Sequence, residues 1–304
     1  MNRPAFDKQG RQIAWDATAI TALQECKRKY YYKIVKGLIP KTDELSIHLV
    51  FGGEFARSIE EFWKLFFEIG DKEEALNSVV YAMMCRSYNN PSYSRSTSKS
   101  RFNLIKTFVW YIDEFFTIDS FQIYHEDGQP MLERSFALDT GDLILCGRID
   151  RVITIEDNLF IMDQKTTGST VDNWFFKTFT PNNQVSCYLT AGMSIFARPV
   201  KGFVVDAITI QVNNSSFLRG FVQRTKAYLE EWYEGIVKET SFVRDADPEL
   251  EKDWPQNPNA CGYYSGCEYR EVCSLSPKAR PTFLNQFEIS YWDSSKGLRD
   301  GETE

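Results

Sequence analysis

The chain has 304 residues, enough to bury a large core as one domain with appendages. Aromatic residues make up 15% of the sequence, and no apolar run is long enough to span a membrane. The formal net charge of −7 argues against broad, nonspecific coating of nucleic acid, although it leaves room for a local basic channel.

The first predicted element is a helix over Thr18–Lys33, in which Cys26 is followed by basic residues and three consecutive tyrosines. Interleaved basic and aromatic side chains favour binding of single-stranded nucleic acid. We therefore assign Lys27 and Arg28 to nucleic-acid binding. The alternative, which the residues support equally, is a solvated helix face whose tyrosines pack inward.

The next helix is indicated by apolar residues that recur with helical spacing. Two more helices are predicted at Glu73–Tyr88 and Arg101–Phe116, with a Ser-rich loop over 89–99 between them. The apolar stripe of the first of these three helices consists of Phe51, Phe55, Ile59, Phe62, Trp63, Phe66 and Phe67.

Strands and helices alternate through the second half of the chain. This alternation predicts an α/β fold in which helices flank a central mixed β-sheet. The predicted strands are Met131–Leu138, Ile144–Ile155, Leu159–Gln164, Phe203–Ile210 and a candidate partner strand at Phe217–Thr225, and the predicted helices are Asn183–Phe196 and Lys226–Glu239.

The strongest chemical pattern lies where two apolar, β-branched runs flank a short polar break and predict a β-hairpin. If Glu156 and Asp157 form the turn, antiparallel register places Asp150 opposite Asp163, with Cβ atoms ~5 Å apart. Alternation along the strand places Lys165 on the face of Asp163. Opposed carboxylates repel, and a hard divalent cation is the usual remedy. The alternative is a surface hairpin with solvated charges, but these charges interrupt runs that indicate a buried strand, which favours a functional site.

This hairpin resembles the core of the PD-(D/E)XK nuclease superfamily. Asp150 stands at the first acidic position of that family, and Asp163, Gln164 and Lys165 stand at its (D/E)-x-K motif. The resemblance implies a restriction-endonuclease-like core and metal-dependent hydrolysis of a DNA phosphodiester. By that resemblance Asp150, Asp163 and the backbone carbonyl of Gln164 would hold Mg²⁺ or Mn²⁺, and Lys165 would orient or deprotonate the attacking water.

Two further positions narrow the resemblance to the RecB-like branch of the family. Gln184 and Tyr188 fit its Q-x-x-x-Y motif, and their i,i+4 spacing places them on one helical face. The resemblance implies that these two side chains contact the DNA backbone or buttress the site. We also assign Arg148 to nucleic-acid binding, because it could neutralise a phosphate.

The first motif of the family, a helix bearing G-x-x-x-H-x-x-x-E, is only partly present. Ala56 occupies the position of the histidine, which is often a metal ligand in the family, and Glu60 keeps the glutamate. The resemblance leaves Glu54, Glu60 or a water to complete the metal shell, and we assign Glu60 because it matches the motif.

Three of the seven cysteines, Cys261, Cys267 and Cys273, lie in a segment rich in Pro, Asn and Gly, where cysteines are usually metal ligands or disulfides. The polar N-terminus shows no signal peptide, so we expect a cytoplasmic, reducing compartment in a prokaryotic or phage-infected cell, which favours metal. With only two histidines in the chain, Cys26 is the candidate fourth ligand. The remaining cysteines lie in apolar stretches and are expected to be small core residues: Cys85, Cys146 and Cys187.

One cysteine near the start and three near the end is similar to the iron–sulfur branch of RecB-like nucleases, which includes the AddB nuclease domain and the CRISPR-associated RecB-like exonucleases. The stretch Thr18–Tyr31 resembles the opening helix of that branch. The resemblance implies a [4Fe–4S] cluster that joins the two termini. The gap between Cys261 and Cys267 is five residues where the branch usually has two, so Zn²⁺ stays an alternative.

The resemblance runs from about Thr18 to Cys273 and leads us to expect one nuclease domain over 1–283, followed by a tail over 284–304. Within the domain we expect a helical part over 18–118, a nuclease core over 131–239 and a cysteine-rich segment over 240–283.

The expected function is an exonuclease that acts on single-stranded DNA ends in recombination, repair or the processing of phage and mobile-element DNA. Recombination or CRISPR-type protein partners are left open. The main alternative is a weakly active or inactive DNA-binding or assembly module that keeps the fold and the cluster, which the loss of the histidine at Ala56 favours. A zinc-stabilised RNA-processing enzyme is a further alternative that rests on the cysteine spacing.

Overall fold

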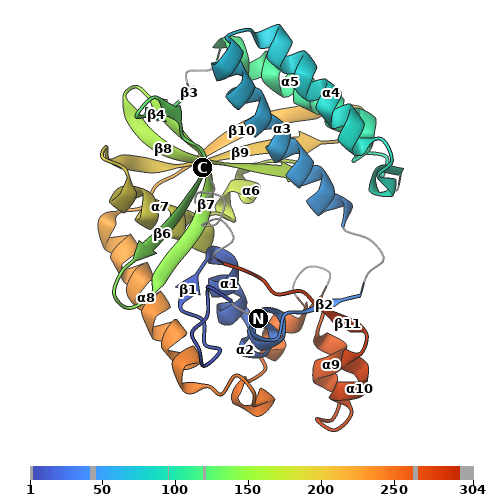
Figure 1. The fold of residues 1–304 in the computed structure, drawn as a ribbon, viewed down its shortest axis with the longest axis vertical. Helices are drawn as coiled ribbons and strands as arrows, with labels where there is room; N and C mark the ends of the chain where they lie inside the picture. The colour runs from blue at the N-terminus through green and yellow to red at the C-terminus, as the bar shows by residue number, and fades with distance from the viewer. Residues whose placement is uncertain (1–2, 42–45, 95, 119–120, 263–265, 295–304) are drawn as a thin grey trace.

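A computed structural model of the protein describes residues 3–41, 46–94, 96–118, 121–262 and 266–294. Its architecture is α/β, with a central mixed sheet flanked by helices (Figure 1), as the sequence predicts. The sheet has seven strands in the order β1-β7-β8-β9-β10, and β3 and β6 also pair with β7. The strands are β1 (Ala14–Trp15), β3 (Gln122–Ile123), β6 (Leu132–Asp139), β7 (Ile144–Ile155), β8 (Asn158–Thr167), β9 (Val200–Ile210) and β10 (Ser215–Val222).

The hairpin of β7 and β8 has the predicted turn and the predicted register. Glu156 and Asp157 adopt φ angles of 46° and 64°, the left-handed conformation that a tight two-residue hairpin turn requires. The antiparallel ladder runs from the pair next to the turn up to Arg151 and Met162. The following pair of positions is Asp150 and Asp163, so the two carboxylates face each other where the ladder ends.

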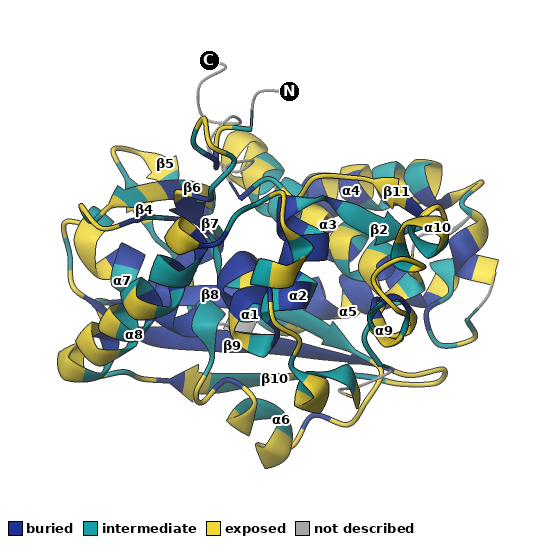
Figure 2. Ribbon diagram, turned by 90° about the horizontal axis from the view of Figure 1, so that it is seen from below, coloured by how far each residue is buried: buried dark blue, intermediate teal, exposed yellow. Residues whose placement is uncertain are grey.

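A crossover carries the chain from β8 to the parallel strand β9. It contains α6 (Asn173–Lys177) and α7 (Asn183–Ile195), and β10 then returns antiparallel to β9. β9 is buried at all but one of its positions (Figure 2), because helices cover the sheet on both faces here. β8, which carries Asp163 and Lys165, lies between β7 and β9 in the sheet.

Two apolar cores lie on the two sides of the sheet. On one side α3 (Ile47–Ile69), α4 (Lys72–Ser87) and α5 (Arg101–Ile118) pack together and against the end of β9 (Figure 1). The other side carries the larger core, to which α1 (Ala17–Glu25), α7 and α8 (Lys226–Asp245) contribute. Four residues of the predicted stripe on α3 are fully buried, and Phe67 is exposed: the buried ones are Phe51, Phe55, Ile59 and Phe62.

The predicted helix over Thr18–Lys33 is broken in the structure. α1 ends at Glu25, and Cys26 is extended, with φ −164° and ψ 121°. The chain then resumes as α2 (Lys27–Tyr30) and continues as a π-helical turn, η1 (Tyr31–Val35). The break turns Cys26 away from the regular helical ladder and toward the C-terminal segment, where its Sγ accepts a hydrogen bond from a backbone N–H.

Residues 284–294 do not form a separate tail, which corrects the predicted domain boundary. Strand β11 (Phe287–Ile289) pairs antiparallel with β2 (Leu38–Pro40), so the end of the domain is joined to its beginning (Figure 1). The chain then reaches Ser294, which is buried against Cys146 of β7. The predicted tail beyond 294 lies outside the described residues.

The other short elements are η2 (Pro91–Ser94), the pair β4 (His125–Glu126) and β5 (Gln129–Pro130), η3 (Glu251–Asp253), η4 (Pro258–Gly262), α9 (Arg270–Ser274) and α10 (Arg280–Leu284). Within the described ranges, no helix has both the length and the apolar character needed to cross a membrane.

Candidate active site

Asp150, Asp163 and Lys165 come together at the open end of the β7–β8 hairpin. The Nζ atom of Lys165 lies 2.5 Å from Oδ2 of Asp163, which places both side chains on one face of β8 as alternation predicts. Oδ2 of Asp150 accepts a hydrogen bond of 3.0 Å from the backbone N–H of Gln164. Two carboxylates and an ammonium thus share a small volume at the end of a rigid hairpin.

The Q-x-x-x-Y residues of α7 lie over the same group. The Nε2 atom of Gln184 donates a hydrogen bond of 2.9 Å to Oδ1 of Asp163, which fixes the plane of that carboxylate. Tyr188 is buried one turn later, and burial raises the pKa of its phenol well above the ordinary range. The two side chains therefore buttress Asp163 from the helix side.

The negative charge of the Asp163 carboxylate is unfavourable where it lies. Its side chain is only 2% exposed, and burial together with the neighbouring charge of Asp150 raises its pKa to about 7. Lys165 opposes this rise but does not cancel it. Additional positive charge would stabilise a carboxylate in this position, and a divalent cation is one source of such charge.

Glu133 of β6 is a member of the site that the sequence analysis missed. Burial, and next the charge of Asp150, raise the pKa of Glu133 to about 7, and its carboxylate pairs with Arg148 at 2.6 Å. Glu133 has a φ of 49°, and the β6–β7 ladder skips the position between its regular pairs. The flanking pairs set position 133 opposite Asp150, and both side chains line one small pocket.

Helix α3 brings Glu60 and Ala56 to the acidic group. Both line a small pocket together with Glu133, Asp150 and Gln164. The carboxylate of Glu60 pairs with Lys64 at 2.6 Å on its solvent side. Ala56, at the histidine position of the motif, and Glu60, the motif glutamate, therefore both lie beside the carboxylates of Glu133 and Asp150.

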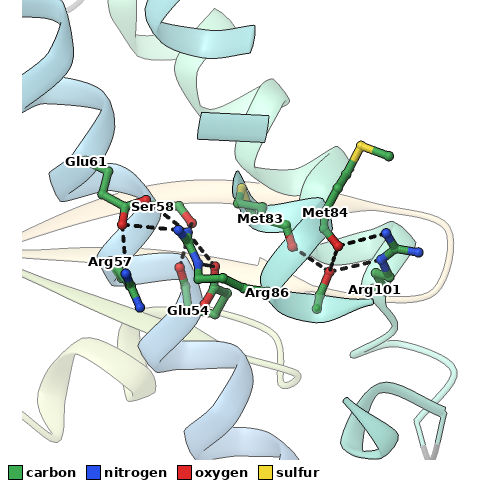
Figure 3. Close-up of polar contacts among 9 residues, drawn as sticks. Glu54, Arg57, Ser58, Glu61, Met83, Met84, Arg86 and Arg101 are labelled. Atoms are coloured by element: carbon green, nitrogen blue, oxygen red, sulfur yellow. Dashed lines mark hydrogen bonds and ion pairs between the residues drawn. The ribbon is translucent and has the colours of Figure 1, made fainter. Parts of the chain in front are cut away.

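Glu54, the other candidate for the metal shell, faces away from the site. Its carboxylate pairs at 2.7 Å with Arg86 of α4, which also contacts Glu61 at 2.9 Å (Figure 3). These contacts join α3 to α4. Of the two glutamates considered in the sequence, Glu60 is the one that the structure places beside Asp150.

A cleft of about 1000 Å³ opens above Lys165. Its walls come from α1 and the segment after it, from β7, from the start of α7 and from residues 290–294. Four cationic side chains line it: Lys29, Lys33, Arg148 and Lys165. Gln184 and Tyr188 also line it, so the cleft reaches the hairpin site at Lys165 and at the two residues of α7.

The structure corrects the basic residues assigned to nucleic-acid binding on the first helix. Arg28 is buried, pairs with Glu251 and donates a hydrogen bond of 2.7 Å to the carbonyl of Trp254, so it serves the fold. Lys27 pairs with Glu239 of α8. Lys29 and Lys33 line the cleft in their place. The three tyrosines between and after them are buried, as the inward-packing alternative predicts: Tyr30, Tyr31 and Tyr32.

Arg151 points to the opposite side of the sheet from Asp163. Its guanidinium pairs at 3.0 Å with Asp206 of β9, which is fully buried. Arg219 of β10 pairs with the other oxygen of Asp206 at 3.2 Å, and the hydroxyl of Tyr111 donates to the same carboxylate. This network lies beneath the hairpin and links α5 to three strands.

Two of the four cysteines of the expected cluster, Cys26 and Cys261, contact Asn257. Its backbone N–H donates to Sγ of Cys26 at 3.3 Å, and Sγ of Cys261 lies 3.8 Å from its carbonyl oxygen. The backbone N–H of Cys267 donates to the carbonyl of Cys261 at 3.2 Å. Burial raises the pKa of Cys273 to about 11, and the neighbouring thiols Cys26 and Cys267 add to the rise.

Among the described residues, no group of three or more His, Cys, Asp or Glu side chains is placed so that it could hold a metal ion, at either the hairpin or the cysteines. Residues 263–265, between two of the cysteines, lie outside the described part. Three cysteines were expected in the core. Cys146 and Cys187 are buried as expected, whereas Cys85 is exposed on α4, so the expectation for Cys85 was wrong.

Comparisons with known proteins give one family and two distant structures. A model of the PD-(D/E)XK nuclease superfamily matches residues 14–274. The crystal structure of a "putative exonuclease" from Eubacterium rectale has 15% sequence identity and a TM-score of 0.45, covering 75% of this chain and 79% of its own. The crystal structure of SSO0001 has 12% identity and a TM-score of 0.31, covering 85% of this chain and 98% of its own. No curated protein matches the chain.

The match to the family model covers most of the chain. It contains the β7–β8 hairpin, the helix that carries Gln184, and Cys26, Cys261, Cys267 and Cys273. The chain belongs to the PD-(D/E)XK nuclease superfamily.

Proposed function

We propose that this protein is a Mg²⁺- or Mn²⁺-dependent deoxyribonuclease, an exonuclease that acts on single-stranded DNA ends. The observation that carries the proposal is the convergence of Asp150, Asp163 and Lys165 at the end of the hairpin, where Lys165 lines the cleft. Membership of a nuclease family makes DNA the expected substrate.

The side chains at the hairpin fit a hard divalent cation. They offer oxygen donors of high charge density, and Asp163 is a buried carboxylate whose pKa is raised by burial and by the neighbouring charge of Asp150. We assign Asp150, Asp163, the backbone carbonyl of Gln164 and Glu60 as its ligands. When bound, the cation supplies Lewis-acid stabilisation of the phosphate charge.

Lys165 is the residue that we assign to the attacking water. It lines the cleft, and its ammonium is held 2.5 Å from Asp163, so it can orient a water at the scissile phosphate and stabilise the charge that develops there. Gln184 keeps Asp163 in one orientation through its hydrogen bond. Tyr188 reaches the same cleft and is placed to contact the DNA backbone.

We further propose that Cys26, Cys261, Cys267 and Cys273 together hold a [4Fe–4S] cluster, with Zn²⁺ as the alternative. The contacts of Cys26 and Cys261 with Asn257, and the effect of Cys26 and Cys267 on the pKa of Cys273, support this assignment. Thiolate sulfur is the donor that both iron–sulfur clusters and structural zinc prefer. We propose a cytoplasmic role in recombination, repair or the processing of phage and mobile-element DNA.

A second candidate function is a DNA-binding or assembly module that has lost catalysis. Ala56 favours it, because this residue faces the acidic pocket at the position where the family carries a histidine. The intact trio of Asp150, Asp163 and Lys165 favours the nuclease.

One experiment separates the two candidates. The protein is purified anaerobically, its absorption spectrum is recorded, and cleavage of end-labelled single-stranded and double-stranded DNA is followed with EDTA, Mg²⁺ or Mn²⁺. The nuclease proposal predicts progressive shortening of the single strand that needs the cation. Binding without cleavage under every cation condition would support the module instead.

A further inference from the structure

The cleft that leads to Lys165 has a balanced charge. Each of its four cations pairs with a carboxylate. The distances are 2.7 Å for Lys29 with Glu25 and 3.7 Å for Lys33 with Glu268, and the other two pairs are those of Arg148 and Lys165 described above. Phosphate attraction alone therefore gives this groove little hold on a strand, and other contacts must contribute.

Trp292 is the residue in the cleft that is suited to hold a base. It lines the cleft and is 41% exposed. Its indole Nε1 donates a hydrogen bond of 2.7 Å to Oδ2 of Asp16, the residue that also caps the N-terminus of α1. The ring is thus anchored by its edge to a rigid element while much of its surface stays accessible.

The two other exposed tryptophans differ from Trp292. The ammonium of Lys106 lies 4.9 Å from the ring centroid of Trp110, and that of Lys177 lies 4.8 Å from the ring of Trp174. In the part of the chain that the structure describes, no cation or aromatic ring stacks on Trp292. Its neighbour Tyr291 is held by its own contacts, because its ring packs on Gly37 and under the guanidinium of Arg3.

We infer that Trp292 is a stacking platform for an unpaired base of the strand that occupies the cleft. This inference rests on the proposed function for the identity of the substrate, and it adds a residue that selects single-stranded nucleic acid. A base in a duplex is already stacked and paired, so the indole can stack on a base only where the strand is single. An anchored ring also loses little freedom when it binds, which favours affinity.

The test compares two strands of equal length in EDTA, so that binding is measured without cleavage. One is oligothymidine, and the other carries abasic sites throughout, which keeps the phosphates and removes the bases. Fluorescence anisotropy gives the Kd of wild type, Trp292→Ala, Trp292→Phe and the matched control Trp110→Ala, whose tryptophan is 42% exposed. Thermal melting by circular dichroism checks that every variant folds.

We expect Trp292→Ala to weaken binding of oligothymidine roughly 5- to 100-fold, the range that loss of one stacked base gives. Binding of the abasic strand should stay unchanged. Trp292→Phe should recover most of the loss because it keeps an aromatic face, and Trp110→Ala should bind as wild type does.

The inference is overturned if Trp292→Ala binds oligothymidine as wild type does, if it weakens both strands equally, or if wild type binds neither strand. The nuclease proposal fails on a different result. Wild type that discriminates the two strands through Trp292 but never cleaves DNA with Mg²⁺ or Mn²⁺ would sink the proposed activity and leave the stacking platform in place.

Discussion

The contact between Asp163 and Lys165 is the residue-scale feature on which the proposed catalysis depends. We expect Asp163→Asn and Lys165→Ala each to reduce metal-dependent cleavage by about 100-fold or more, because each removes a group that acts on the reacting phosphate. Asn at 163 keeps the acceptor for Gln184 and removes a carboxylate that repels Asp150, so the fold should persist.

The measurement is the initial rate of cleavage of end-labelled DNA, with circular dichroism as the test of folding. Asp157→Asn is the matched control, because Asp157 lies in the turn of the same hairpin and asparagine tolerates its left-handed φ of 64°. A wild-type rate in either active-site variant would remove the assignment.

The two glutamates of α3 provide a second residue-scale comparison. Glu60 lines the pocket beside Asp150, whereas Glu54 is paired with Arg86 on the side of α4. We expect Glu60→Gln to raise the Mg²⁺ or Mn²⁺ concentration needed for half-maximal cleavage, and Glu54→Gln to leave it unchanged. A titration of cleavage rate against cation concentration decides the ranking, and the reverse order would place the ligand at Glu54.

The sequence predicts the residues whose spacing fixes their geometry and misses those whose geometry depends on irregular backbone. Asp150, Asp163 and Lys165 follow from strand alternation and a two-residue turn. Glu133 was missed, because only the pairing of β6 with β7, in which position 133 falls opposite Asp150 between two regular pairs, brings it to the site, and its φ of 49° is a local irregularity. Arg28 was misassigned because the sequence pattern of a basic residue next to tyrosines is the same whether its side chain faces solvent or a buried carbonyl.

At the scale of elements, the ion network beneath the hairpin joins β7, β9 and β10 to α5. Asp206 is its centre, since it pairs with both Arg151 and Arg219. We expect Asp206→Ala to lower the free energy of unfolding by about 3–5 kcal/mol, because it leaves two buried guanidiniums without their carboxylate. Urea denaturation followed by circular dichroism measures the change.

Asp113→Ala is the contrasting variant. It lies on α5 and pairs with Lys72 at 2.8 Å, but its side chain is 57% exposed. Removal of this surface pair should cost no more than about 1 kcal/mol. Equal losses in the two variants would show that the buried network has no special part in holding the sheet to α5.

Long elements with clear periodicity are predicted well, and short ones fixed by distant partners are not. β7 was predicted with its exact bounds, and α7 within one residue. Three short strands, β1, β2 and β11, have only two or three residues each, which is too few for alternation to predict them. They form because a distant strand pairs with them. The break of the first helix at Cys26 likewise depends on a contact with residue 257.

At the scale of the whole molecule, the cysteines bring the beginning of the chain to its last third. We expect serine at Cys26, Cys261, Cys267 or Cys273 to reduce bound metal and to lower the midpoint of thermal unfolding, because a metal that cross-links distant segments restricts the unfolded chain. The metal is measured by elemental analysis and by absorption near ~400 nm for an iron–sulfur cluster.

Cys85→Ser and Cys187→Ser serve as controls for that experiment, one exposed and one buried, and neither should change the metal content. Metal that survives Cys26→Ser but is lost in Cys187→Ser would contradict the proposed ligand set.

The pairing of β2 with β11 also bears on how the molecule assembles in time. The β7–β8 hairpin closes through a two-residue turn, an event of about 1–10 μs. β2 and β11 meet across nearly the whole chain, and contacts of such long separation form slowly. Residues 290–294, which follow β11, therefore close their wall of the cleft late. We therefore expect a folding molecule to bring Asp150, Asp163 and Lys165 together before the wall of the cleft that carries Trp292 is in place, and pulse-labelling hydrogen exchange should show the amides of β7 protected before those of β2.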